Sequence, residues 1–345
     1  MIIRILSLFF ISINLLAYET GLIKKTYNNF EKNRLFYTNI YYPTSSKMNF
    51  TLVGDNPVFL GIQVKENSPI ANSKFPLIIL VHGSGGNNTN LNYLVEALVS
   101  KGIIVIAANY PGSTTGDSIP SETVRVWIQN EDVIFLLDQV LKDEQINNNI
   151  LKNSIGIMGH SKGAYTSIAK VGGRLELNKF INYCAINPQM PDCIFYKSGN
   201  VDLNTLDKEK FEKSYLDRRF SYAIAIDPGY GTSFDEKSLK NIDIPILLIL
   251  ADYYSPKNTK ENLLGDNIYV SLNKKKAFYK KIIDSGHFSF LSECKKDALE
   301  ILAEDGEDEM IICQDGKKSR NDVHKETIET VLQFLNEIDV IRGWF

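Results

Sequence analysis

The chain has 345 residues, of which 44% are hydrophobic and 23% charged, and its formal net charge is −3. These fractions are ordinary for globular proteins and exclude disordered and fibrous classes. The small net charge gives no electrostatic footprint for nucleic acid, and Lys274–Lys276 is too short a basic run to alter this. We interpret that run as a solvated turn before a strand. No Pro/Gly/Ser-rich linker divides the chain, so a single domain over residues 18–345 is predicted.

The N-terminus has the pattern of an export signal. Arg4 precedes an apolar run, Ile5–Leu16, which ends at Ala17. The run is too short to span a bilayer as a stable helix. It predicts a signal peptide over residues 1–17 and a secreted or periplasmic protein. An uncleaved anchor or a buried N-terminal strand is the alternative.

The four cysteines agree with an oxidising compartment. Cys184 and Cys193 are nine residues apart, and Cys294 and Cys313 are nineteen apart. Three connectivities are possible, and local pairing would close two surface loops. We therefore predict Cys184–Cys193 and Cys294–Cys313 disulfides, whereas free thiols would be expected in a reducing cytosol.

Short apolar runs alternate with helical stretches, which is the pattern of a mostly parallel sheet covered by helices. The predicted strands are Leu77–Val81, Ile103–Ala108, Ile155–Met158, Tyr222–Ile226, Ile246–Leu250 and Phe278–Ile283. Helices are predicted over Leu91–Lys101, Glu122–Lys142 and Asn321–Ile338. Arg34–Tyr42 and Val58–Val64 are predicted to form an N-terminal antiparallel extension. The fold class is therefore α/β, and the long segment 172–220 is interpreted as a cap insertion over the active site.

The sharpest chemical signal is Gly159–Gly163 (Gly-His-Ser-Lys-Gly), which lies between a predicted strand and a helix. A nucleophile elbow needs this context, because its serine adopts strained backbone angles and the flanking glycines allow close backbone approach. We predict that Ser161 is the nucleophile. The alternative is a helix N-terminus that is merely capped by a serine.

A glycine-rich turn, Val81–Gly86, follows an upstream apolar strand. It can aim backbone N–H groups at a developing oxyanion, and we assign this role to the N–H groups of Ser84 and Lys162. A phosphate-binding loop is excluded because no Gly-Lys-Ser/Thr sequence follows these glycines.

The base and the acid should follow the nucleophile along the chain. His287 lies just after the last predicted strand and is the candidate base, while His82, His160 and His324 are interpreted as structural. Two aspartates end neighbouring strands and are candidates for the acid. In folds with this order of nucleophile, acid and base, the acid more commonly lies three residues after the small residue that ends the second of these strands. That position is Tyr254, which cannot serve, so we favour Asp227 and keep Asp252 as the alternative.

The chain from Arg34 to the last helix resembles the predicted dienelactone hydrolase and platelet-activating-factor acetylhydrolase-like branch of the α/β-hydrolases. The segments that carry the resemblance are Lys74–Gly86, Gly159–Gly163, Ala225–Pro228 and Gly286–Leu291. The resemblance implies that the acid comes from the strand end that holds Asp227. Ser161 departs from true dienelactone hydrolases, which use a cysteine, and Lys162 stands where such enzymes often carry an aromatic or apolar residue.

Together these residues predict a serine hydrolase that acts on small or slender carboxylic esters through an acyl-enzyme. No metal or other cofactor is expected, because the histidines lack ligand spacing and the acidic run 304–309 lacks the spacing of a calcium loop. We interpret that run as a solvated loop. A peptidase, an acyltransferase or a catalytically silent binding module on the same fold remain alternatives. The natural ester and the oligomeric state are not predicted.

Overall fold

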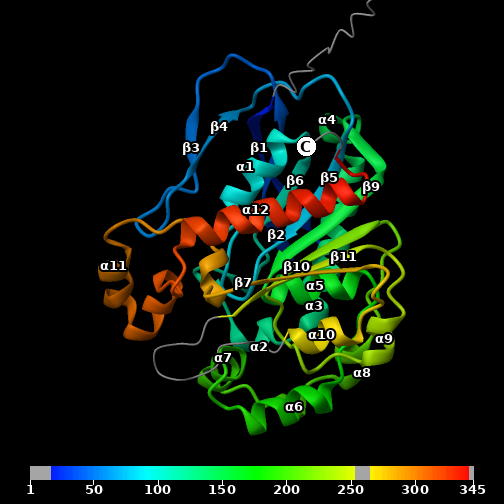
Figure 1. Ribbon diagram of the computed structural model, residues 1–345, viewed down its shortest axis with the longest axis vertical. Coiled ribbons are helices and arrows are strands. Elements are labelled where there is room, and N and C mark those ends of the chain that lie inside the picture. The colour runs from blue at the N-terminus through cyan, green and yellow to red at the C-terminus, as the bar shows by residue number, and fades with distance from the viewer. Residues whose placement is uncertain (1–16, 253–264, 342–345) are drawn as a thin grey trace, which may run out of the picture.

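The centre of the protein is one mixed β-sheet. The computed structural model describes residues 17–252 and 265–341, and in this part of the chain ten strands have the order β12-β11-β10-β9-β5-β6-β2-β1-β4-β3 (Figure 1). The first six strands of this order run parallel to one another. The strands of this sheet are β1 (Glu19–Asn29), β2 (Arg34–Thr44), β3 (Thr51–Val53), β4 (Ile62–Glu66), β5 (Phe75–Val81), β6 (Ile104–Ala108), β9 (Ile150–His160), β10 (Tyr222–Ile226), β11 (Ile246–Ala251) and β12 (Ala277–Ile282). A separate two-stranded sheet pairs β7 (Ser113–Thr114) with β8 (Asp117–Ser118). The α/β class and the parallel centre are therefore confirmed.

Alternation along the strands builds two separate hydrophobic layers. In β5, Leu77 and Ile79 pack into the layer that contains α3 (Val126–Lys142) and α5 (Lys162–Lys170). Ile78 and Leu80 point to the opposite face, as successive strand residues must. That face is covered by α1 (Asn92–Ser100) and α12 (Arg320–Glu337). Because both faces are covered, these strands have the almost continuous apolar sequences from which they were predicted.

The N-terminal extension differs from its prediction. β2 pairs antiparallel with β1 and β6, not with the segment 58–64. The second strand of the extension is Ile62–Glu66, which pairs antiparallel with β3 and parallel with β1. β1 was missed because its outer half alternates exposed and partly buried residues and includes Lys24 and Lys25, so it carries no apolar run.

Two helical predictions also need correction. The segment 122–142 is not one helix, because α2 (Pro120–Thr123) ends before α3 begins at Val126. The acidic run 304–309 is not a loop, because it is divided between α11 (Ala298–Asp305) and the 3₁₀ helix Glu307–Cys313. The turn at Lys274–Lys276 does precede a strand, as predicted.

The segment 172–220 forms a helical layer at the lower end of the sheet in Figure 1. Its helices are α6 (Leu177–Ile186), α7 (Pro191–Ser198), the 3₁₀ helix Leu203–Thr205 and α8 (Lys208–Glu212). The Cys184–Cys193 disulfide joins α6 to α7, and Cys294–Cys313 closes a second loop. Both predicted pairings are therefore confirmed. Helices α9 (Glu236–Lys240) and α10 (Asp266–Ser271) lie near each other. The short helix α4 (Glu144–Asn147) follows α3, and a 3₁₀ helix spans His287–Phe290.

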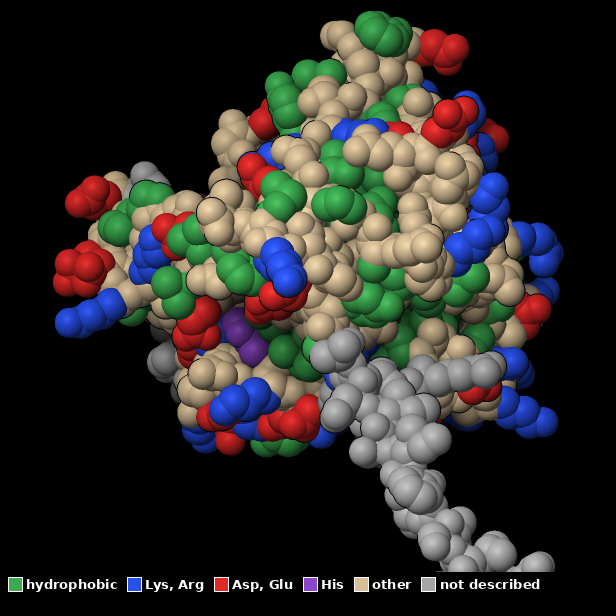
Figure 2. All heavy atoms as spheres, turned by 90° about the horizontal axis from the view of Figure 1, so that it is seen from above, with side chains coloured by type: hydrophobic (Ala, Val, Ile, Leu, Met, Phe, Trp, Pro, Cys, Tyr) green, Lys and Arg blue, Asp and Glu red, His purple; other side chains and the backbone are tan. Residues whose placement is uncertain are grey.

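Two features of the described structure concern the predictions on nucleic acid and on membranes: the surface charge and the length of the helices. On the face shown in Figure 2, Lys and Arg side chains are interspersed with Asp and Glu. Across residues 17–252 and 265–341, none of the helices combines the length and apolar character needed to cross a membrane. The predicted signal peptide lies outside the described residues except for Ala17.

Candidate active site

The predicted nucleophile elbow is a sharp turn between β9 and α5. Ser161 has φ +58° and ψ −122°, a conformation that non-glycine residues rarely adopt. Its N–H donates to the carbonyl of Ile226 at 3.0 Å, and its carbonyl accepts from the N–H of Gly229 at 3.3 Å. These bonds tie the strained serine to the end of β10.

Close backbone packing explains the glycines around Ser161. A Cβ atom on Gly159 would lie 2.3 Å from backbone atoms of Gly163, and one on Gly163 would lie 2.0 Å from the carbonyl oxygen of Val81. A Cβ on Gly83 would approach the Cβ of Ser161 to 2.9 Å. The glycines therefore allow β5, β9 and the oxyanion turn to meet at the serine.

A buried histidine–aspartate pair lies beside this turn. His287 Nδ1 is 2.6 Å from Asp227 Oδ2, and both side chains are about one-twentieth exposed, at 6% and 5%. Asp227 follows β10 with φ +44°, and its other oxygen accepts the N–H of Ala251 at 3.0 Å. Because an ionised carboxylate only accepts, the Nδ1 of His287 carries the proton and its Nε2 is free to act as a base.

The alternative acid lies in a different environment. Asp252 follows β11, and its backbone N–H donates to Ser285 at 3.1 Å. Its carboxylate is 3.7 Å from the ammonium nitrogen of Lys281. The structure thus brings Asp227, and not Asp252, to His287. Tyr254 lies outside the described residues.

His160 connects the histidine to the elbow. The Nε2–H of His160 donates to the backbone carbonyl of His287 at 2.9 Å, and the two rings are 4.5 Å apart between centroids. Burial lowers the pKa of His160 well below its usual value, so it remains a neutral donor. Among the described residues, Ser161 Oγ has no hydrogen-bond partner. In enzymes without substrate the serine–histidine bond is often long and tightens on binding.

The backbone N–H groups of the two predicted oxyanion donors lack a partner in the hydrogen bonds of the described backbone. The Lys162 N–H is at the first position of α5, where a helix offers no carbonyl partner. In the glycine-rich turn, the N–H groups of Gly85 and Gly86 bond to Ser113 and Gly83, but no backbone bond of the Ser84 N–H to a described residue is seen. The Lys162 N–H directly follows the serine, and Ser84 follows Gly83, whose backbone packs against Ser161.

Two comparisons with known proteins found similarity to this chain. The family model of chlorophyllase matches residues 55–189. Among solved structures, a ferulic acid esterase from Streptomyces cinnamoneus is similar over 93% of this chain and 90% of its own, with a TM-score of 0.59 and 18% identity. The chain has the α/β-hydrolase fold. A search of curated protein sequences finds no significant match. The narrower resemblance to dienelactone hydrolases and acetylhydrolases stays a prediction.

The remaining two histidines are held by contacts away from the histidine–aspartate pair. His82 Nδ1–H donates to Gly83 at 2.7 Å, its Nε2 accepts from Tyr110 at 3.2 Å, and burial lowers its pKa to about 4. His324 donates to Leu291 at 2.7 Å and stacks on Tyr93 at 3.6 Å. Burial lowers the pKa of His324 to about 4 as well.

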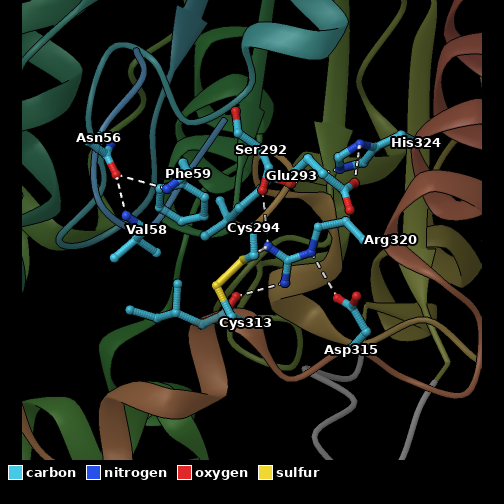
Figure 3. Close-up of a disulfide and its surroundings, with 12 residues drawn as sticks. Asn56, Val58, Phe59, Ser292, Glu293, Cys294, Cys313, Asp315, Arg320 and His324 are labelled. Carbon is cyan, nitrogen blue, oxygen red and sulfur yellow. Dashed lines mark hydrogen bonds and ion pairs between the residues drawn. A yellow bond between two sulfur atoms is a disulfide. The ribbon is translucent and has the colours of Figure 1, made fainter. Parts of the chain in front are cut away.

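The segment after His287 is anchored by a residue that the sequence analysis missed. Arg320 donates to the carbonyls of Ser292 and Ile312 at 3.0 and 2.7 Å and pairs with Asp315 at 2.8 Å, beside the Cys294–Cys313 disulfide (Figure 3). Arg320 is 2% exposed. Since its partners are spread along the chain, only the three-dimensional structure shows its role.

The side chain of Lys162 is unusual because its ammonium group is buried. Its ammonium nitrogen is buried, lies 3.3 Å from the hydroxyl of Ser113, and interacts electrostatically with Asp132. Burial lowers its pKa to about 7. Asp132 is itself bonded to Arg34 at 2.8 Å, so a buried charged cluster lies behind the nucleophile.

No described group of three or more His, Cys, Asp or Glu side chains could hold a metal ion in residues 17–252 and 265–341.

Proposed function

We propose that this protein is a serine carboxylester hydrolase with Ser161 as nucleophile, His287 as base and Asp227 as the acid that orients it. The observation that carries the proposal is the 2.6 Å contact between His287 Nδ1 and Asp227 at the edge of a strained serine turn. The chlorophyllase-family match and a structural neighbour named an esterase support an esterase-type hydrolase.

The mechanism follows the positions of these groups. Ser161 Oγ attacks the ester carbonyl, and His287 Nε2 takes the proton and returns it to the leaving alcohol. Asp227 holds the imidazole in the required tautomer and stabilises its protonated form. The N–H groups of Ser84 and Lys162 receive the oxyanion, each lowering the barrier by about 3–4 kcal/mol. Water activated by His287 then releases the acid from Ser161.

The helical segment 172–220 is proposed to be a cap that limits the substrate to small or slender esters. Its helix α7 supplies Tyr196, whose hydroxyl is 2.6 Å from that of Tyr230 in the loop after Asp227. Since α7 reaches this loop, substrates must fit between the cap and the strand ends. Export by residues 1–17 is also part of the proposal, and the two disulfides are compatible with a secreted or periplasmic protein.

Hydrolysis of a short-chain 4-nitrophenyl ester tests the proposal. Ser161→Ala should lower kcat by at least about 10³-fold, because the nucleophile is lost. Ser167→Ala is the matched control, since Ser167 lies on the same helix and bonds to Gly163 at 3.0 Å. If Ser161→Ala retains the wild-type rate, the proposal is wrong. Parallel assays with peptide anilides and with acceptor alcohols distinguish an esterase from a peptidase or an acyltransferase.

A further inference from the structure

One acidic residue of the cap has a buried carboxylate that forms no regular hydrogen bond to any described residue. Asp192 lies in the first turn of α7, and neither of its carboxylate oxygens has a hydrogen-bond partner among the described residues although both are buried. Buried polar groups are almost always hydrogen-bonded, and a buried unpaired carboxylate is costly. Burial accordingly raises the pKa of Asp192. Such a group therefore requires an explanation.

The position of Asp192 points to the active site. Its carboxylate interacts electrostatically with His287 and faces the backbone N–H of Tyr230. Tyr196 follows it by four positions on α7 and hence lies on the same helix face. The Tyr196 hydroxyl contacts that of Tyr230 at 2.6 Å and interacts with Ser84. The inner face of α7 thus presents Asp192 and Tyr196 to the catalytic groups.

Neighbouring structure holds Asp192 in this position. The next residue, Cys193, forms the disulfide to Cys184 in α6. The hydroxyl of Tyr183, also in α6, is buried beside the carboxylate, and Asp192 adds to burial in raising the pKa of this tyrosine. Because α6 and α7 are cross-linked beside it, Asp192 cannot readily turn out to solvent.

Stabilisation of the helix does not explain this burial. An acidic residue in the first turn interacts favourably with a helix N-terminus, and the N–H groups of residues 192 and 193 do lower the pKa of Asp192 in part. An exposed side chain would give the same benefit without desolvation. Glu209 in the first turn of α8 is an exposed example in the same cap.

We propose that Asp192 is a specificity-determining residue that binds a protonated amine carried by the ester, which rests on the proposed function. An ammonium group supplies the missing hydrogen bonds and also neutralises the carboxylate in its buried site, whereas a neutral hydroxyl would leave the charge uncompensated. The amine can belong to the acyl or to the alcohol part.

Isosteric esters test the proposal at about pH 6.5, where aliphatic amines are protonated. The acyl series is 4-nitrophenyl 3-aminopropanoate, 3-hydroxypropanoate and butanoate, and the alcohol series is 2-aminoethyl and propyl butanoate. In one series, wild-type kcat/KM for the amine ester should exceed that for the neutral isostere by about tenfold to a hundredfold. Asp192→Asn should remove this preference and change kcat/KM of the neutral ester by less than about threefold, while Glu209→Gln should retain it.

Equal rates for amine and neutral esters in both series, or a preference that persists in Asp192→Asn, would overturn the proposal. A hydroxyl ester preferred over the amine ester would overturn the ammonium assignment. Hydrolysis of the neutral esters, and its loss in Ser161→Ala, tests the esterase function separately. If no ester is hydrolysed, binding of propylammonium and of propan-1-ol by ligand-observed NMR still tests Asp192: the cation alone should bind, and only while Asp192 is present. Equal binding to Asp192→Asn contradicts the proposal.

Discussion

Replacing Asp227 with asparagine tests how the acid orients the base. In the wild type, one carboxylate oxygen accepts from His287 Nδ1 at 2.6 Å and the other accepts the N–H of Ala251 at 3.0 Å. An asparagine has only one oxygen, so either orientation of its amide turns an NH₂ group toward one of these two donors. If the oxygen keeps the Ala251 bond, the NH₂ group faces Nδ1. His287 must then carry its proton on Nε2 and cannot accept the proton of Ser161.

The expected loss in kcat is up to about 10⁴-fold, or about 5 kcal/mol of barrier, because the wrong tautomer is favoured. Asp252→Asn is the matched control, since Asp252 contacts Lys281 at 3.7 Å and ends the neighbouring strand. It should change kcat by less than about threefold. Hydrolysis of a short-chain nitrophenyl ester gives both rates, and circular dichroism checks the fold. The reverse ranking would refute the assignment and make Asp252 the acid.

Two further predictions concern stability. Burial lowers the pKa of Lys162 and of Lys170 from 10.5 to about 7, so between these values the unfolded chain binds more protons and the free energy of unfolding rises with pH. Urea unfolding measures this rise in the free energy of unfolding between about pH 7 and pH 9, and Lys162→Met should remove about half of it. Lys152 is exposed, so Lys152→Met should leave the rise unchanged. If the free energy of unfolding of Lys162→Met still rises as steeply with pH as that of the wild type, the burial argument is contradicted. Replacing Cys294 and Cys313 by serine should lower the free energy of unfolding by about 3 kcal/mol, because their bond closes a loop with a sequence separation of 19. Reduction of the wild type without any loss of stability would show that the bond does not constrain the unfolded chain.

The parallel centre of the sheet could be predicted because strands that are buried on both faces have continuous apolar sequences. β10 begins and ends where the sequence predicts, while β9 extends five residues further toward its N-terminus, through four exposed or partly buried residues to the buried Ile150. β1 was missed for the same reason, since only one half of it is buried. Local sequence therefore predicts strands to the extent that both faces are covered.

The site was predictable where a local pattern defines the chemistry. The elbow and the oxyanion turn have glycine patterns that follow from close backbone contact. The choice between Asp227 and Asp252 depends on which strand end faces His287, and both residues end neighbouring strands. That choice is a property of tertiary packing.

Other features gave no local signal. Asp192 and Arg320 are single charged residues whose importance comes from burial and from distant partners. Lys162 stands in the elbow motif, but its lowered pKa results from burial of the ammonium group, which the nearby carboxylate of Asp132 only partly offsets. Charged residues at helix starts are usually exposed, so sequence alone favours the wrong environment for them.

Covalent labelling tests the central claim most directly. Wild-type protein treated with a fluorophosphonate probe and digested for peptide mapping should carry one adduct, on the peptide that contains Ser161. The adduct should be absent from Ser161→Ala and should form far more slowly in His287→Ala, because the base no longer activates the hydroxyl. An adduct on another serine, or undiminished labelling of Ser161→Ala, would contradict the assignment of Ser161 as the nucleophile.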